Sequence, residues 1–243
     1  ALDVSSFDTS QTTDMGYMFY NCSNLPSLDV SHFDTGNVRN MSHMFRSCSR
    51  LTQLDVTGFD TKQVTDMSFM FYGCSELTDL SLQNFDTSKV LYMHYMFYRC
   101  TNLTSLPVEQ FDTSQVTSMR YMFYGCQNLA TVDVSNFDMR NVTTTSYMFY
   151  GCTSLTQIDT SNFHTPKVKF MNYMFANCSM LTELDFSAIE TGALEEMNQL
   201  FSGMTQLSVL TLGDAFQFLP DANLPTVPAV EPNTGYWQNI GNG

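Results

Sequence analysis

The chain has 243 residues, of which 24 are acidic and 10 are basic, so its formal net charge at pH 7 is −14. Nucleic acids and anionic membrane surfaces select for clustered Lys and Arg, so this balance argues against both as partners. No apolar stretch approaches the roughly 20 residues that a membrane helix needs, so we expect no membrane insertion.

The chain is an internal repeat with a period of 26 residues. All seven cysteines keep this frame without insertion, at Cys22, Cys48, Cys74, Cys100, Cys126, Cys152 and Cys178. A fixed period of this length is the signature of a solenoid, in which each coil contacts only its neighbours. We expect one buried free thiol per coil, because an odd number of cysteines cannot pair completely and no CxxC motif or Cys/His cluster indicates a metal site.

The first element of each repeat is predicted to be a short strand. In the third copy, Leu54 and Val56 alternate with Asp55 and Thr57, which is the period of a strand with one buried face. Nine such strands are expected to stack in parallel as one long sheet. They begin at Leu2, Leu28, Leu54, Leu80, Leu106, Val132, Ile158, Leu184 and Leu210.

The solvent side of these strands is one candidate binding surface, because repeat solenoids commonly bind through such faces. It carries a column of carboxylates, for which we single out Asp29, Asp55, Asp133 and Asp159. The column is interrupted at Ser81 and Pro107, which indicates either a site or sequence drift.

A turn follows each strand, and in the third copy it contains Phe59 and Asp60. The phenylalanine is predicted to be buried in a stacking column. The aspartate has counterparts in five other coils, so like charges lie one coil apart. Hydrogen bonds from nearby backbone N–H groups are the favoured compensation. Bound Ca²⁺ is the alternative, although the repeat lacks the dense carboxylates of a dedicated calcium repeat.

The next element is predicted to be a short helix. Met67, Met70, Phe71 and Cys74 have i, i+3, i+4, i+7 spacing, which places four apolar residues on one helix face. Gly73 stands where that helix is expected to end.

On such a helix, a double row of aromatic residues points away from the core. We single out Tyr95, Tyr98, Tyr121, Tyr124, Tyr147 and Tyr150 as candidate ligand-binding residues. A contiguous exposed aromatic patch usually marks a contact surface. The alternative is that these rings stack on one another and shield the edge of the solenoid, and the two interpretations are compatible.

The repeat frame weakens after Ser187 and stops after Leu212. Terminal repeats are atypical because they close the core. We therefore predict a solenoid over residues 1–213, followed over residues 214–243 by a C-terminal cap and a Pro-rich tail.

Three blocks of the sequence carry a family resemblance: Leu51-x-x-Leu54-Asp55-Val56, Phe85-Asp86-Thr87-Ser88-x-Val90 and Met70-Phe71-Tyr72-Gly73-Cys74. Over roughly residues 1–213 the chain resembles the BspA-type leucine-rich repeat proteins, and more narrowly the bacterial surface protein 26-residue repeat. The segment Thr234–Gly243 resembles, more weakly, segments that follow such repeats in surface proteins of lactic acid bacteria, which are Gram-positive. The fold class expected is α/β: a right-handed leucine-rich-repeat-like solenoid of about eight coils, each with a short parallel strand and a short helix.

The resemblance implies a secreted protein anchored to the bacterial cell wall, with the signal and anchor outside this stretch of sequence. It also implies adhesion to a host extracellular protein, mucin or other glycan. The alternative is a structural stalk or self-associating scaffold that projects other domains. We expect no enzyme and no cofactor, because the four histidines are scattered among coils and no phosphate-binding loop or nucleophile motif is present.

Overall fold

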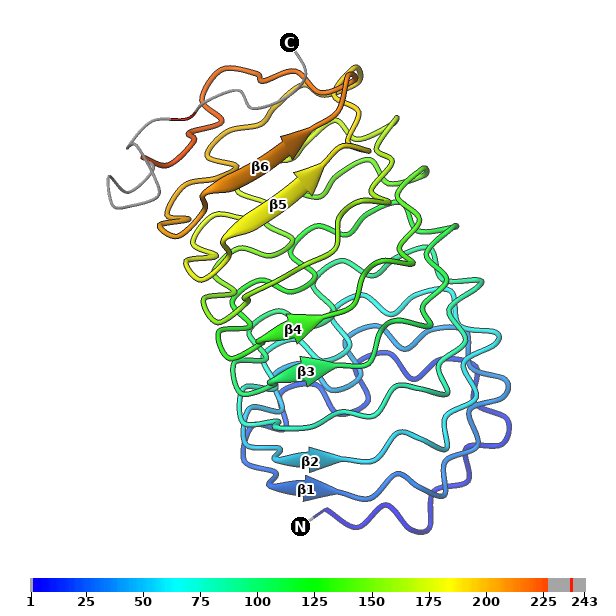
Figure 1. Ribbon diagram of the computed structural model, residues 1–243. Helices are drawn as coiled ribbons and strands as arrows, with labels where there is room; N and C mark the ends of the chain where they lie inside the picture. The colour runs from blue at the N-terminus through cyan, green and yellow to red at the C-terminus, as the bar shows by residue number, and fades with distance from the viewer. Residues whose placement is uncertain (1, 227–236, 238–243) are drawn as a thin grey trace.

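The computed structural model describes residues 2–226 and residue 237, which form a stack of coils with its strands on one side (Figure 1). The strands are Ser27–Leu28 (β1), Gln53–Leu54 (β2), Ser105–Leu106 (β3), Thr131–Val132 (β4), Glu183–Phe186 (β5) and Val209–Leu212 (β6). Each pair is parallel and in the repeat register; Leu28, for example, lies opposite Leu54. The parallel, repeating arrangement of a leucine-rich-repeat-like solenoid is therefore confirmed.

The expected single sheet of nine strands is wrong for the described residues. These contain three separate two-stranded sheets, β1–β2, β3–β4 and β5–β6. The coils that contain Leu2, Leu80 and Ile158 contribute no strand. Beside the Leu80 coil, Pro107 follows β3 directly and has no N–H to donate to a neighbouring carbonyl, which weakens the ladder there.

A second line of parallel pairing joins the coils without a break. Seven single bridges connect eight coils through Asp14, Asn40, Asp66, Tyr92, Ser118, Thr144, Phe170 and Glu196. This ladder agrees with the expected number of about eight coils. It immediately precedes the segment for which a helix was predicted.

The predicted helix is wrong, because the described residues contain no helix at all. In the segment 67–74, alternate backbone N–H groups donate to the next coil and not to a carbonyl four residues back. The four bonds are Met67 N to Tyr92 O at 3.0 Å, Phe69 N to His94 O at 3.1 Å, Phe71 N to Met96 O at 3.0 Å and Gly73 N to Tyr98 O at 2.7 Å. Tight turns lie between these bonds, such as the one closed by Met70 N and Met67 O at 3.3 Å.

The turns explain why this segment has the apolar spacing of a helix. Phe69 is the third residue of one turn and has φ 58°, and Gly73 is the third residue of another and has φ 72°. A positive φ at this position is the mark of a type II turn. The resulting zigzag turns Met67, Met70, Phe71 and Cys74 inward, where all four are fully buried.

The core consists of columns that repeat from coil to coil. The predicted Phe59 column is buried in every coil from Phe33 onward, and the phenylalanines of the turn segment stack with ring centroids 5.8 Å apart for Phe45 and Phe71. The prediction of free thiols is confirmed, with six cysteines buried and Cys22 half-buried.

The turn aspartates are held by the backbone, as predicted. Asp60 Oδ1 accepts a hydrogen bond from Lys62 N at 3.1 Å, and Asp86 Oδ1 accepts one from Ser88 N at 3.0 Å. In five coils a buried threonine follows the aspartate and bonds to the next coil; Thr61 Oγ1, for example, donates to Asp86 O at 2.9 Å.

At the C-terminal end, a chain segment replaces the missing next coil. Gln199 N donates to Asp221 O at 2.6 Å, and Phe201 N donates to Ala222 O at 3.2 Å. Trp237 packs against the core, and its Nε1 donates to Pro225 O at 2.8 Å. The remainder of the predicted Pro-rich tail, 227–236 and 238–243, lies outside the described residues. Over residues 2–226 the structure has no helix long and apolar enough to cross a membrane.

Candidate functional site

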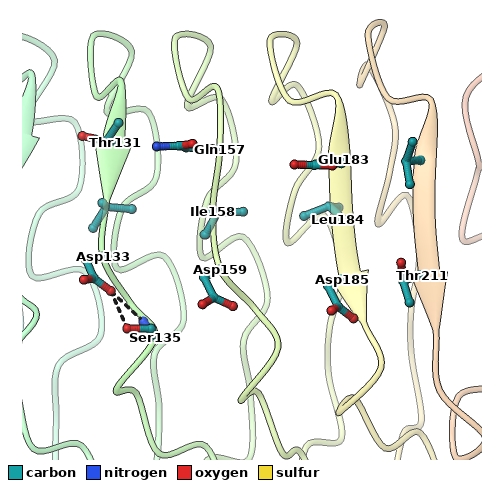
Figure 2. Close-up of a pocket in the computed structure, with 12 residues that line it drawn as sticks. Thr131, Asp133, Ser135, Gln157, Ile158, Asp159, Glu183, Leu184, Asp185 and Thr211 are labelled. Atoms are coloured by element: carbon teal, nitrogen blue, oxygen red, sulfur yellow. Dashed lines mark hydrogen bonds between the residues drawn. The ribbon is translucent and has the colours of Figure 1, made fainter.

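A groove of about 680 Å³ lies on the strand side of the stack and crosses four coils (Figure 2). Two rows of polar side chains line it, with apolar side chains between them. The first row is Thr131, Gln157 and Glu183, the second is Asp133, Asp159, Asp185 and Thr211, and the apolar residues between them include Val132, Ile158 and Leu184. We call this surface the strand groove.

The aspartates of the strand groove are held rigidly by the residue two positions later. Asp133 Oδ1 accepts hydrogen bonds from Ser135 N at 3.0 Å and from Ser135 Oγ at 2.6 Å. Asp159 is held in the same way by Ser161. The Ser135 hydroxyl lowers the pKa of Asp133, and this effect outweighs the opposing influence of Asp159 one coil away. Both carboxylates are therefore charged at neutral pH.

The predicted carboxylates divide between the strand groove and the coils before it. Asp133 and Asp159 line the groove. Asp29 and Asp55 have the same local geometry, with Oδ1 bonded to Ser31 and Thr57, but line neither this hollow nor the next one.

A second hollow of about 440 Å³ adjoins the strand groove and shares Thr131, Val132 and Asp133 with it. Its lining includes Ser81 and Pro107, so the interruption of the acidic column lies in a hollowed part of the strand face.

The row of Thr131, Gln157 and Glu183 was missed in the sequence. Each of these residues precedes an inward-facing Val132, Ile158 or Leu184, so strand alternation places it outward beside the aspartate row. The strand alternation could have identified this column, but its residue type varies from coil to coil and gives no consensus residue.

The six predicted tyrosines form two columns of parallel rings, which we call the tyrosine face. The centroid separation is 4.5 Å for Tyr95 and Tyr121 and 4.6 Å for Tyr98 and Tyr124. Tyr147 and Tyr150 continue the two columns. All six are half-buried. The mutual stacking that we considered is therefore present, and a role in ligand binding stays a prediction.

The backbone of the turn segment positions the first of these columns. Tyr95, Tyr121 and Tyr147 have φ values of 60°, 59° and 62°, in the left-handed region that non-glycine residues seldom adopt. Burial is the main cause that raises the pKa of Tyr98, to about 12, so its hydroxyl stays protonated at neutral pH.

Metal binding was the other chemistry considered for the carboxylates. Among the described residues there is no group of three or more His, Cys, Asp or Glu placed to hold a metal ion. Ca²⁺ binding along an aspartate column stays a prediction.

The chain was compared with curated proteins, solved structures and protein families. No curated protein matches the chain. One matching solved structure is the functional domain of InlJ from Listeria monocytogenes, which is described as including a cysteine ladder. The identity is 19%, the TM-score is 0.25, and the match covers 87% of this chain and 46% of the other, so this chain spans less than half of that structure's length.

A family model matches residues 1–106 and 93–211. The chain therefore belongs to the family described as Mycoplasma protein of unknown function, DUF285.

Proposed function

We propose that the chain is a non-catalytic binding module of a bacterial cell surface, which holds an extended segment of a host extracellular protein, mucin or other glycan in the strand groove. The observation that carries this proposal is the continuity of the groove across four coils. A surface of this length suits an extended ligand, which contacts the same kind of side chain in each successive coil.

The lining gives the groove its chemical preference. Asp133, Asp159, Glu183 and Asp185 supply negative charge, while the half-buried Ile158 supplies apolar contact between the two polar rows. No Lys or Arg lines the groove. It therefore favours a ligand that carries positive or hydrogen-bond-donating groups along an apolar backbone.

The proposed location is the outer surface of a bacterium, with secretion and cell-wall anchoring. The resemblance of the 26-residue repeat to the BspA-type surface proteins supports this proposal. The net charge of −14 is consistent with a protein that does not bind anionic membranes directly.

A glycan and matrix-protein array tests the function, probed with and without Ca²⁺. The matched variant replaces Asp133, Asp159 and Asp185 by Asn. This change removes three charges but keeps the turns, because Asn40 already accepts hydrogen bonds from Ser42 N at 2.9 Å and Ser42 Oγ at 2.7 Å in the same geometry. We expect the native chain to bind members of the array and the variant to lose those signals. Equal signals from both proteins would contradict a role for the groove.

A structural stalk is the second candidate function. The observation that favours it is the uninterrupted stacking of phenylalanine rings along the core from Phe19 to Phe175, which stiffens the coils. Size-exclusion chromatography with light scattering separates the two functions when it is run beside the array. A monomer without affinity for any array member would favour the stalk, and a concentration-dependent oligomer would favour a self-associating scaffold.

A further inference from the structure

The three segments that carry the tyrosine face lack negative charge. Segments 92–104, 118–130 and 144–156 contain no Asp or Glu, although the chain contains 24 of these residues. In these three coils the carboxylates lie instead on the strand side and in the turns that follow it, for example at Asp86, Asp112 and Asp138. The surface of these three coils is therefore divided by charge, and the tyrosine face is the part that does not repel an acidic partner at short range.

Two exposed arginines sit on this face. The guanidinium carbon of Arg99 lies 5.6 Å from the ring centroid of Tyr98, and that of Arg120 lies 4.9 Å from the ring centroid of Tyr121. Neither arginine belongs to the three ion pairs of the described residues. A guanidinium stacked on a ring is held in place and keeps N–H groups free for the oxygens of a carboxylate.

The mutual stacking of the tyrosines excludes partners that would bind by stacking on their ring faces. Tyr98 lies between Tyr72 at 4.4 Å and Tyr124 at 4.6 Å, so both of its ring faces are covered. Tyr121 is covered in the same way by Tyr95 and Tyr147. A nucleobase or a sugar ring has no free ring face on which to stack within these columns. The surface offers ring edges, hydroxyl groups and guanidinium groups.

We propose that the tyrosine face binds an acidic segment of a partner protein, whose carboxylates pair with Arg99 and Arg120. Tyr and Arg are the residues that most often carry the binding energy of protein–protein interfaces. Charge complementarity selects the partner, because over residues 2–226 and 237 neither arginine forms an ion pair with a carboxylate. This surface is separate from the strand groove and has the opposite preference for charge.

The test uses a fluorescein-labelled oligoglutamate peptide and fluorescence anisotropy near physiological ionic strength. At this ionic strength the electrostatic screening length is about 8 Å, so distant carboxylates of the chain add little repulsion of the acidic peptide. Arg99→Gln combined with Arg120→Gln is compared with Lys62→Gln combined with Lys167→Gln, which lowers the net charge equally but leaves the tyrosine face intact. We expect the arginine variant to bind the peptide about tenfold more weakly or worse, and the lysine variant to change the affinity by about twofold or less.

Thermal unfolding checks that both variants fold, and all four side chains are exposed. The groove variant with Asn at positions 133, 159 and 185 should keep its affinity for the peptide, which separates this proposal from the proposed function. The inference is overturned if the native chain does not bind the peptide, or if the two charge variants lose affinity equally. It is also overturned if a sulfated polysaccharide binds through Arg99 and Arg120 while the peptide does not.

Discussion

Six successive coils each bury a thiol against the backbone of the preceding coil. Cys100 Sγ donates to Phe71 O at 3.1 Å, and the same bond recurs from Cys48 to Cys178. Burial raises the pKa of Cys48, Cys126 and Cys178 to about 12. Thiolates are the reactive form of cysteine, so these residues are protected both by burial and by protonation.

We therefore predict that a thiol reagent at pH 8 modifies one cysteine rapidly in the folded protein, namely the half-buried Cys22. The other six should react only as the chain unfolds, or as the pH rises towards the raised pKa values. Absorbance after addition of Ellman's reagent measures the two phases. Cys22→Ser should abolish the fast phase, and rapid modification of several cysteines in the native protein would contradict the buried column.

At the scale of one element, the turn segment shows where the helix prediction failed. Four apolar residues at helical spacing are compatible with a helix and also with consecutive turns that have positive φ. The column that contains Gly73, Gly125, Gly151 and Gly203 in four coils and Asn21 or Asn177 in two others fits both structures, because a left-handed residue also ends many helices. In the structure it holds a left-handed turn residue, and Ser47 and Arg99 adopt the same conformation in the two remaining coils, with φ 62° and 54°.

Substitution of Gly151 tests the left-handed turn conformation directly. Its φ is 71°, and a Cβ added there would meet only Gly125 Cα at 3.8 Å, an ordinary contact. We predict that Gly151→Ala lowers the free energy of unfolding by about 1 kcal/mol through backbone strain alone. Gly151→Asn should cost much less, because Asn21 and Asn177 hold the same conformation at φ 59° and 62°. Urea denaturation measures both changes, and a stabilising alanine would refute the turn geometry.

The tyrosine columns also belong to the scale of the element. Tyr124 stacks on Tyr98 at 4.6 Å and on Tyr150 at 4.7 Å. We predict that Tyr124→Ser lowers the free energy of unfolding by about 2 kcal/mol, because two ring contacts and buried ring surface are lost. Tyr124→Phe should be nearly neutral, since Phe69 in the neighbouring column stacks on Tyr95 at 4.5 Å without a hydroxyl group. Thermal denaturation compares the two, and equal losses would show that the hydroxyl stabilises the fold more than the stack does.

At the scale of the whole molecule, the repeat frame was readable from the sequence because one residue type occupies the same position in coil after coil. The buried Phe, Met and Cys columns follow from that frame, and so do the backbone bonds of Asp60 and its counterparts. The hydrogen bonding of the turn segment did not follow from the sequence. Backbone bonds between coils take the place of bonds within a helix, and both arrangements bury the same residues. The strand groove was only half predicted, since Asp133 and Asp159 are repeat positions but Gln157 and Glu183 are not.

The resulting molecule has two surfaces with different charge. The strand groove is acidic and hollow, whereas the tyrosine face is free of carboxylates in three successive coils and carries Arg99 and Arg120. Different partners are therefore expected on the two surfaces, and each surface has a variant that leaves the other unchanged.

The central claim is that the strand groove holds the extracellular ligand. Surface plasmon resonance tests it most directly, by measuring the affinity for a ligand selected on the array. It compares the native chain with the variant in which Asp133, Asp159 and Asp185 are replaced by Asn. We predict that the variant binds about tenfold more weakly or worse while its thermal unfolding is unchanged, because three charges are lost and the Asx turns are kept. An affinity equal to that of the native chain would contradict the claim.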